Sequence, residues 1–155
     1  MKIEFWVIGK TSDKFIDEGI QFYTKKIKYF VDLQLIVFQD IKHIKNDVLL
    51  KAKEAEKYLE KIKDDDFVIL LDENGKEYNS RMFANFIEQR QNQSIKRLIF
   101  IVGGAFGFDE KLYARANMKI ALSKMTFSHQ LVRIIFLEQM YRAYSIIHNF
   151  PYHND

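Results

Sequence analysis

The stretch Leu98-Ile99-Phe100-Ile101-Val102, followed by Gly103-Gly104-Ala105-Phe106-Gly107-Phe108-Asp109, decides the fold. A short run of apolar residues that ends at glycines is typical of a strand covered on both faces. Glycines allow a tight turn or a close approach of backbone to a ligand, and aspartate is a favoured first residue of a helix. The stretch therefore predicts a strand, a loop and a helix in succession, as in parallel α/β folds.

The glycine-rich loop has two readings that the residues alone leave open. It is either a tight strand-to-helix turn or a loop whose backbone contacts a ligand. A nucleotide-binding P-loop is excluded because the Lys-Ser/Thr ending is missing. A dinucleotide fingerprint is disfavoured by the spacing of the glycines and by their place after the fourth predicted strand.

Similar patterns continue outward from this stretch and predict an α/β fold with a mostly parallel sheet. Apolar runs or alternation predict four more strands, at Ile3–Ile8, Val31–Phe38, Phe67–Leu71 and Lys119–Ser123. Helical spacing predicts helices over Asp13–Tyr29, Asp47–Lys63, Asn79–Arg90, Asp109–Ala116 and Ser128–His148. No repeat, low-complexity tract or shift in composition divides the chain, so we expect one domain over residues 1–155.

Two of these helices carry detailed expectations. In the second, the buried stripe should consist of Val48, Ala52, Ala55, Leu59 and Ile62, with Lys and Glu on the solvated side. In the third, Ser80 is the candidate N-cap.

Composition excludes several classes of protein. The chain has 155 residues, of which 48% are hydrophobic, so a core can form and global disorder is excluded. The absence of cysteine excludes disulfides, thiolate metal sites and a cysteine nucleophile. The four histidines show no metal-ligand spacing, so we expect no metal. No apolar run approaches the ~18 residues of a membrane helix and no signal peptide is evident, so we expect a cytoplasmic protein with no membrane partner.

Ligands of open parallel sheets bind outside the carboxyl ends of the strands. That rule selects three stretches: Asp72–Lys76, expected to be a turn, the loop Gly103–Asp109, and the link Ser123–His129. The link is polar and lacks glycine, and we expect it to place His129 in the first turn of the last helix. His129 would there suit a neutral base or a hydrogen-bond donor, although a simple capping turn from Ser128 explains the same residues.

The last helix is apolar on several sides, as Ile134, Phe136 and Met140 illustrate. A helix that is apolar all round is buried. We therefore expect a homodimer that covers it, the alternative being a core within one chain. The lone proline, Pro151, should end this helix, and the tail after it could fray or dock over a site.

Several motifs follow one another along the second half of the chain: Leu71-Asp72, Gly75-Lys76, Ile101-Val102-Gly103-Gly104-x-x-Gly107, Leu122-Ser123-Lys124-Met125-Thr126-Phe127-x-His129, Leu131-Val132-Arg133, Glu138-Gln139-x-Tyr141-Arg142-Ala143 and Pro151-Tyr152-His153. With them the chain closely resembles the bacterial ribosomal RNA large subunit methyltransferase H family of the SPOUT superfamily, over essentially its whole length. The first half matches mainly in pattern.

The resemblance implies a SPOUT-type parallel-sheet fold with a C-terminal trefoil knot, and a homodimer. It also implies S-adenosylmethionine-dependent methylation of N3 of a pseudouridine in 23S rRNA of the assembled ribosome. Carried over by position, the cofactor contacts are Leu71, Gly103, Leu122, Ser123, Lys124, Met125, Thr126 and Phe127. Gly104 joins them because a glycine there lets backbone reach the cofactor.

The resemblance leaves the general base open among His129, Tyr152 and His153. Arg142 is the candidate partner of the anionic base or of a phosphate. The family often ends with a basic residue after the Tyr-His pair, whereas Asn154 and Asp155 stand here, so one phosphate contact is missing. Two other functions remain to be weighed: a non-catalytic RNA-binding module, and a methyltransferase for another RNA such as tRNA.

Overall fold

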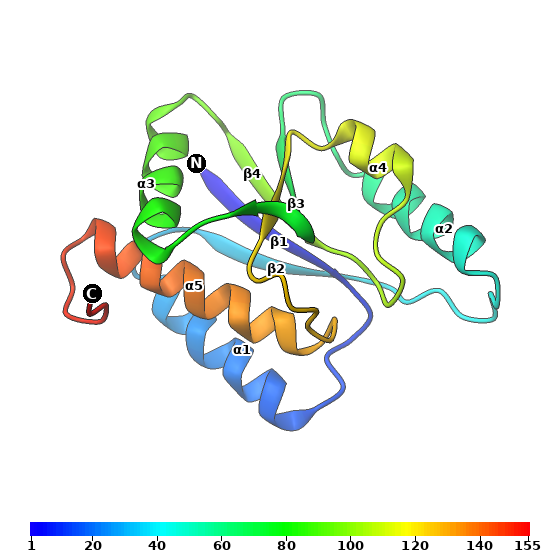
Figure 1. The fold of residues 1–155 in the computed structure, drawn as a ribbon, viewed down its shortest axis with the longest axis horizontal. Coiled ribbons are helices and arrows are strands. Elements are labelled where there is room, and N and C mark those ends of the chain that lie inside the picture. Colours follow the sequence, from blue (N-terminus) through cyan, green and yellow to red (C-terminus); the bar gives the residue numbers. More distant parts are fainter.

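The computed structural model describes all of residues 1–155 and has a single sheet of five parallel strands in the order β2-β1-β4-β3-β5 (Figure 1). Its strands are β1 (Lys2–Ile8), β2 (Leu33–Phe38), β3 (Phe67–Glu77), β4 (Arg97–Val102) and β5 (Met118–Ala121). Its helices are α1 (Lys14–Ile27), α2 (Asp47–Leu59), α3 (Ser80–Asn92), α4 (Glu110–Arg115) and α5 (Leu131–Ile147). The predicted α/β class with a parallel sheet is confirmed.

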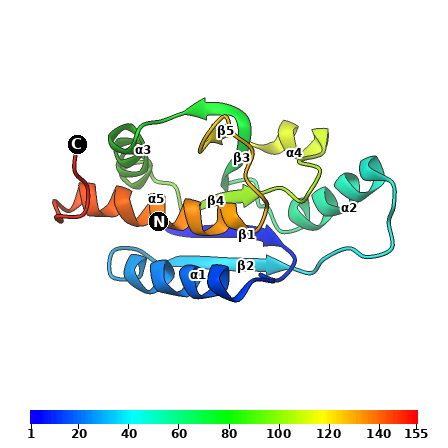
Figure 2. The same ribbon diagram turned by 60° about the horizontal axis from the view of Figure 1, so that its bottom comes forward.

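Helices cover both faces of the sheet (Figure 2). On one face, α1, α3 and α5 enclose a core cluster of 21 buried residues; on the other, α2 and α4 cover a cluster of 10. Side chains of β4 alternate between the two, since Phe100 belongs to the larger cluster and Ile99 and Ile101 to the smaller. The continuous apolar runs therefore mark strands covered on both faces, as predicted.

The predicted turn at Asp72–Lys76 is wrong, because β3 does not stop at Leu71. Ile120 of β5 pairs with both Leu71 and Lys76, so residues 72–75 bulge out of the ladder while pairing continues on either side. The chain passes closest at Gly75, where an added Cβ would lie 2.6 Å from the backbone nitrogen of Ile120. The turn-like residues here form a bulge and a close approach to the backbone of β5.

The buried side of α2 also differs from the predicted stripe. Val48 is 69% exposed, whereas Glu54 and Tyr58 are buried with Ala55. The helix ends at Leu59, earlier than predicted. The reason lies in tertiary contacts, because Glu54 and Tyr58 have polar partners at the end of β4.

The starts of α3 and α4 are set by side-chain caps. The N-cap of α3 is Asn79, whose side chain accepts from Met82, and not Ser80 as predicted. Asp109 caps α4 as predicted, by accepting from Lys111.

Helix α5 begins and ends inside its predicted range. The Ser128 hydroxyl accepts from the Leu131 amide, which is the turn that the alternative explanation expected, while the N-cap position itself is Gln130. Its C-terminus is a Schellman motif, in which Asn149 has a φ of 56° and the Phe150 amide donates to the Ser145 carbonyl at 2.8 Å. The helix therefore stops before Pro151, and the prediction that this proline ends it is wrong.

Helix α5 packs between α1 and α3, where Phe136, Met140 and Tyr144 are fully buried. None of the helices combines the length and the apolar character that crossing a membrane requires.

We predict that Gly75→Ala destabilises the fold. The new methyl group would meet the backbone of β5, which has no flexible side chain to move aside, and overpacking of this kind costs about 1–3 kcal/mol. Urea unfolding measures the change. Asn74→Ala, at the exposed neighbouring position of the same bulge, is the control and should unfold almost as the wild type does.

Candidate functional site

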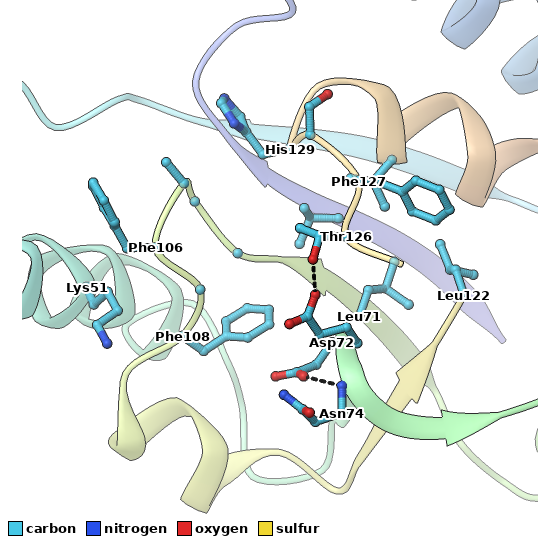
Figure 3. A pocket seen from close by; sticks show the side chains of 18 of the residues that line it. Lys51, Leu71, Asp72, Asn74, Phe106, Phe108, Leu122, Thr126, Phe127 and His129 are labelled. Atoms are coloured by element: carbon cyan, nitrogen blue, oxygen red, sulfur yellow. Dashed lines mark hydrogen bonds between the residues drawn. The ribbon is translucent and has the colours of Figure 1, made fainter. Parts of the chain in front are cut away.

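A cavity of about 860 Å³ lies at the bulge of β3 and the carboxyl ends of β4 and β5 (Figure 3). Its volume lies within the range of small-molecule sites. All three stretches selected from the sequence reach it. Of the residues expected to contact a cofactor or reactant, those that line it are Leu71, Gly103, Gly104, Leu122, Ser123, Met125, Thr126, Phe127 and His129.

Lys124 is the exception among the expected cofactor contacts. Its ammonium group lies 3.7 Å from the Glu77 carboxylate, and its side chain is not part of the cavity wall. Only its backbone could contribute to a site there.

The glycine-rich loop is both a tight turn and a wall of the cavity. The Gly107 amide donates to the Gly104 carbonyl at 3.2 Å, and Gly107 has a φ of 82° that favours glycine. An added Cβ on Gly103 would come within 3.1 Å of the Gly107 backbone. The two readings of this loop are therefore compatible, because a turn this tight leaves bare backbone facing the cavity.

The bulge of β3 places two carboxylates in the cavity wall. Thr126 donates a hydrogen bond to Glu73 (Figure 3), and the Tyr113 hydroxyl donates one to Asp72. Burial, together with the neighbouring Asp72, raises the pKa of Tyr113, so that this phenol stays protonated. The wall formed by β3 is therefore acidic, which suits a ligand that carries positive charge.

Below the glycine-rich loop, α2 presents a buried polar pair. The Tyr58 hydroxyl donates to the Val102 carbonyl at 3.0 Å, and the Glu54 carboxylate faces the backbone of Gly104. Burial and the nearby Asp40 raise the pKa of Glu54, although a hydrogen bond from Gly104 lowers it in part. Sequence analysis missed the pair, since its only signal was two residues four apart in a helix assigned to an apolar stripe.

Arg133 holds the segment before α5 against the sheet. Its guanidinium is 1% exposed and donates to the carbonyls of Ile8, Gly9 and His129 and to the Thr11 hydroxyl, at 2.8–3.1 Å. His129 itself is exposed at the cavity rim, two residues before α5 begins. The prediction that His129 lies in the first turn of the helix is therefore wrong.

Arg142, Tyr152 and His153 lie away from the cavity, in a cluster around Glu138. Arg142 donates to the Glu138 carboxylate at 2.6 and 3.1 Å, Tyr152 donates to it at 3.0 Å, and Arg142 lies 3.2 Å from the His153 ring. Arg142 is about 17 Å along α5 from the end near the cavity. The structure thus does not bring these three residues to the cavity of their own chain (Figure 1).

The last residue fixes this tail further. The Asp155 carboxylate pairs with Arg81 of α3 and lies 3.2 Å from the His153 ring. No group of three or more His, Cys, Asp and Glu side chains is arranged to hold a metal ion.

Comparison with known proteins decides the family. Residues 1–153 match the family model described as "Predicted SPOUT methyltransferase". The chain belongs to the SPOUT methyltransferase family. It is similar to proteins named "Ribosomal RNA large subunit methyltransferase H" from Christiangramia forsetii (45% identical, 99% of each chain) and Parabacteroides distasonis (44%, 100% of each). A protein of the same name from Flavobacterium johnsoniae is 42% identical over 99% of each chain.

We predict that Glu54→Gln stabilises this SPOUT methyltransferase at neutral pH. Because the pKa of Glu54 is raised in the folded state, its charged form opposes folding, and that cost grows as pH rises through the raised pKa. The glutamine removes the charge while keeping its shape. Below the ordinary carboxyl pKa of 4.5, both proteins are neutral at this position and the difference should shrink.

Urea unfolding at a series of pH values measures the effect. The exposed Glu56→Gln, two positions along the same helix, is the matched control and should show no such pH-dependent gain. A gain for Glu54→Gln that is equal at acid and neutral pH would contradict the raised pKa.

Proposed function

We propose that the chain transfers a methyl group from S-adenosylmethionine to N3 of a pseudouridine in 23S rRNA of the assembled ribosome. The observation that supports this most is the cavity, which gathers the three strand-end stretches that the family resemblance assigns to the cofactor. The names of the similar proteins support ribosomal RNA as the substrate class.

The residues of the cavity suit this cofactor. Leu122, Phe127 and Val102 offer apolar surface for an adenine ring, and the bare backbone at Gly103 allows close approach. Asp72 and Glu73 supply negative charge opposite a ligand that carries a sulfonium and an ammonium group. When bound, S-adenosylmethionine supplies a methyl group that is already activated by its positively charged sulfur.

The residues of the chain then have to hold the nucleotide in line and remove its N3 proton. The N3 atom forms a bond to the methyl carbon as the sulfur–carbon bond breaks, and the proton passes to a base or to water. His129 is the candidate base at the rim of the same chain's cavity. Tyr152 and His153 are the candidates in the tail, and the choice among the three needs the pH profile of their variants.

A homodimer would explain where the tail acts. Tyr152 and His153 are tied to Glu138 and Arg142 at the far end of α5, away from their own cavity. In a dimer, the tail of one chain would complete the site of its partner. Apolar side chains that remain exposed on α1 and at both ends of α5 favour such a partner: Phe15, Phe22, Leu131 and Phe150.

We also infer the trefoil knot of the SPOUT superfamily. The close contact of Gly75 with the backbone of β5 is the support for it, since a knot requires one segment to cross another tightly. The chain then continues from β5 through the link at Ser123–His129 into α5 (Figure 1).

We predict that Gly103→Val abolishes cofactor binding while the chain stays folded. The added side chain would press on the Gly107 backbone and fill the space beside the loop. Calorimetric titration with S-adenosylmethionine should show binding to the wild type and at least a ~100-fold loss in the variant. Circular dichroism checks the fold; unchanged affinity in Gly103→Val would place the cofactor elsewhere.

Transfer of labelled methyl groups tests the function itself. We expect incorporation into 23S rRNA of ribosomes from a strain lacking this enzyme, and none into tRNA. Incorporation into tRNA alone would favour the alternative substrate, and RNA binding without cofactor binding or transfer would favour the non-catalytic module.

We predict that two inactive variants restore activity together. One chain carries Gly103→Val, and the other carries Tyr152→Ala and His153→Ala, with both co-expressed under different tags. If the tail acts across the dimer, half of the dimers are mixed and each has one intact site, so activity should return to about a quarter of wild type. No recovery in purified mixed dimers would show that the tail acts within its own chain.

A further inference from the structure

Two buried side chains of α2 contact the backbone at the start of the glycine-rich loop. Glu54 and Tyr58 are four residues apart and so lie on the same side of the helix. The Tyr58 hydroxyl donates to the carbonyl of Val102, the last residue of β4, and the carboxylate of Glu54 lies directly against the Gly104 backbone. The two contacts flank Gly103, the residue at which the strand gives way to the cavity wall.

Glu54 also accounts for the glycine at position 104. An added Cβ there would lie 2.6 Å from both oxygens of the Glu54 carboxylate. An added Cβ on Gly107, in contrast, would meet nothing within 4 Å. Glycine is favoured there only because the backbone has a positive φ. Glycine is therefore required at these two positions for different reasons, and only at Gly104 is the reason a contact with α2.

The charge of Glu54 has no ion-pair partner. It is 7% exposed and takes part in none of the ion pairs of the structure. Of the charged groups that face it, Asp40 repels it, and Lys57 attracts it while its ammonium group is bonded to the Gln39 carbonyl at 2.7 Å. A buried carboxylate without an ion-pair partner weakens the fold. Stability therefore does not explain why Glu54 lies here, whereas its contact with the glycine-rich loop does.

We propose that Glu54 is a positioning residue of the cofactor site. Glu54 is not part of the cavity wall; in this role its carboxylate accepts from the Gly104 amide and, with Tyr58, holds the loop Gly103–Gly107 in the shape that lines the cavity. This inference rests on the proposed function only in naming the ligand as S-adenosylmethionine. A neutral acceptor of the same shape can hold the amide, whereas an apolar side chain cannot.

Three variants separate this role from packing. Glu54→Leu keeps the volume and removes the acceptor, Glu54→Gln keeps an acceptor, and Glu56→Ala changes only the exposed side of the same helix. We expect Glu54→Leu to raise Kd and KM for S-adenosylmethionine by about tenfold or more, as loss of a hydrogen bond from a charged group does. Glu54→Gln should recover most of that loss, KM for the ribosome should stay within about twofold, and Glu56→Ala should match the wild type.

A double-mutant cycle tests the contact itself. Gly104→Ala should weaken cofactor binding because its methyl group meets the Glu54 carboxylate. If that clash is the cause, Glu54→Ala combined with Gly104→Ala should bind no worse than the weaker of the two single variants. Losses that multiply in the double variant would show that the two residues act independently and would overturn the proposal.

Amide hydrogen exchange of the loop gives a readout that needs no ligand. Exchange over residues 103–107 should be faster in Glu54→Leu than in the wild type, while exchange in the core strand β1 stays unchanged. Equal loop exchange and equal cofactor affinity would overturn the role of Glu54 and leave the proposed function intact. A wild type that binds no S-adenosylmethionine would overturn the proposed function, and the exchange result would still decide whether Glu54 holds the loop.

Discussion

The buried guanidinium of Arg133 is the interaction on which the architecture of the site depends. A charge removed from water must have its donors satisfied, and here no carboxylate does so. Backbone carbonyls from the end of β1 and from His129, with one hydroxyl, take up those bonds. The start of α5 is thereby fixed at the edge of the sheet where all five parallel strands end, and the link before it must run along the cavity.

The same edge explains why the cavity is built largely from backbone. Parallel strands bring their carboxyl ends together, so the segments that follow β3, β4 and β5 meet there whatever their side chains. The bulge at 72–75, the loop at 103–107 and the link at 123–129 each turn away from the sheet at this point. Methyl transfer from an activated donor mainly requires alignment, and bare backbone held from below by Glu54 and Tyr58 suits that requirement.

Periodicity predicted the five strands and five helices, because each is covered by apolar neighbours and such burial leaves a regular pattern. It could not predict the bulge of β3. Asp72–Lys76 has turn-forming residues, and only the second pairing of Ile120 shows that the strand resumes. The cause of the end of α5 was misassigned for a similar reason, since a proline is a visible signal and the left-handed conformation of Asn149 is not.

Of the candidate site, the strand-end rule predicted the three stretches that line the cavity, but not the groups that support them. Glu54 and Arg133 are charged residues whose burial depends on carbonyls and amides far away in sequence, and no local pattern reports such partners. For the tail residues, the resemblance suggested a role in the site that the fold of a single chain does not explain. The resemblance named Tyr152 and His153 with His129 as candidate bases, yet the folded chain holds the first two at the other end of α5.

The pairing of Arg142 changes how RNA recognition should be understood. The chain has a net charge of only +3, and Arg142 was the best local cation for a phosphate or an anionic base. In the structure its guanidinium is paired with the Glu138 carboxylate, which raises the pKa of Arg142. Binding through Arg142 alone would require that pair to break. The intact cluster holds the Tyr152 ring 4.8 Å from the Arg142 guanidinium, and the His153 imidazole lies between Arg142 and Asp155. For the RNA substrate that we propose, a paired arginine favours recognition by stacking and hydrogen bonds over recognition by a basic field, as is common for RNA bases that are splayed out of a helix.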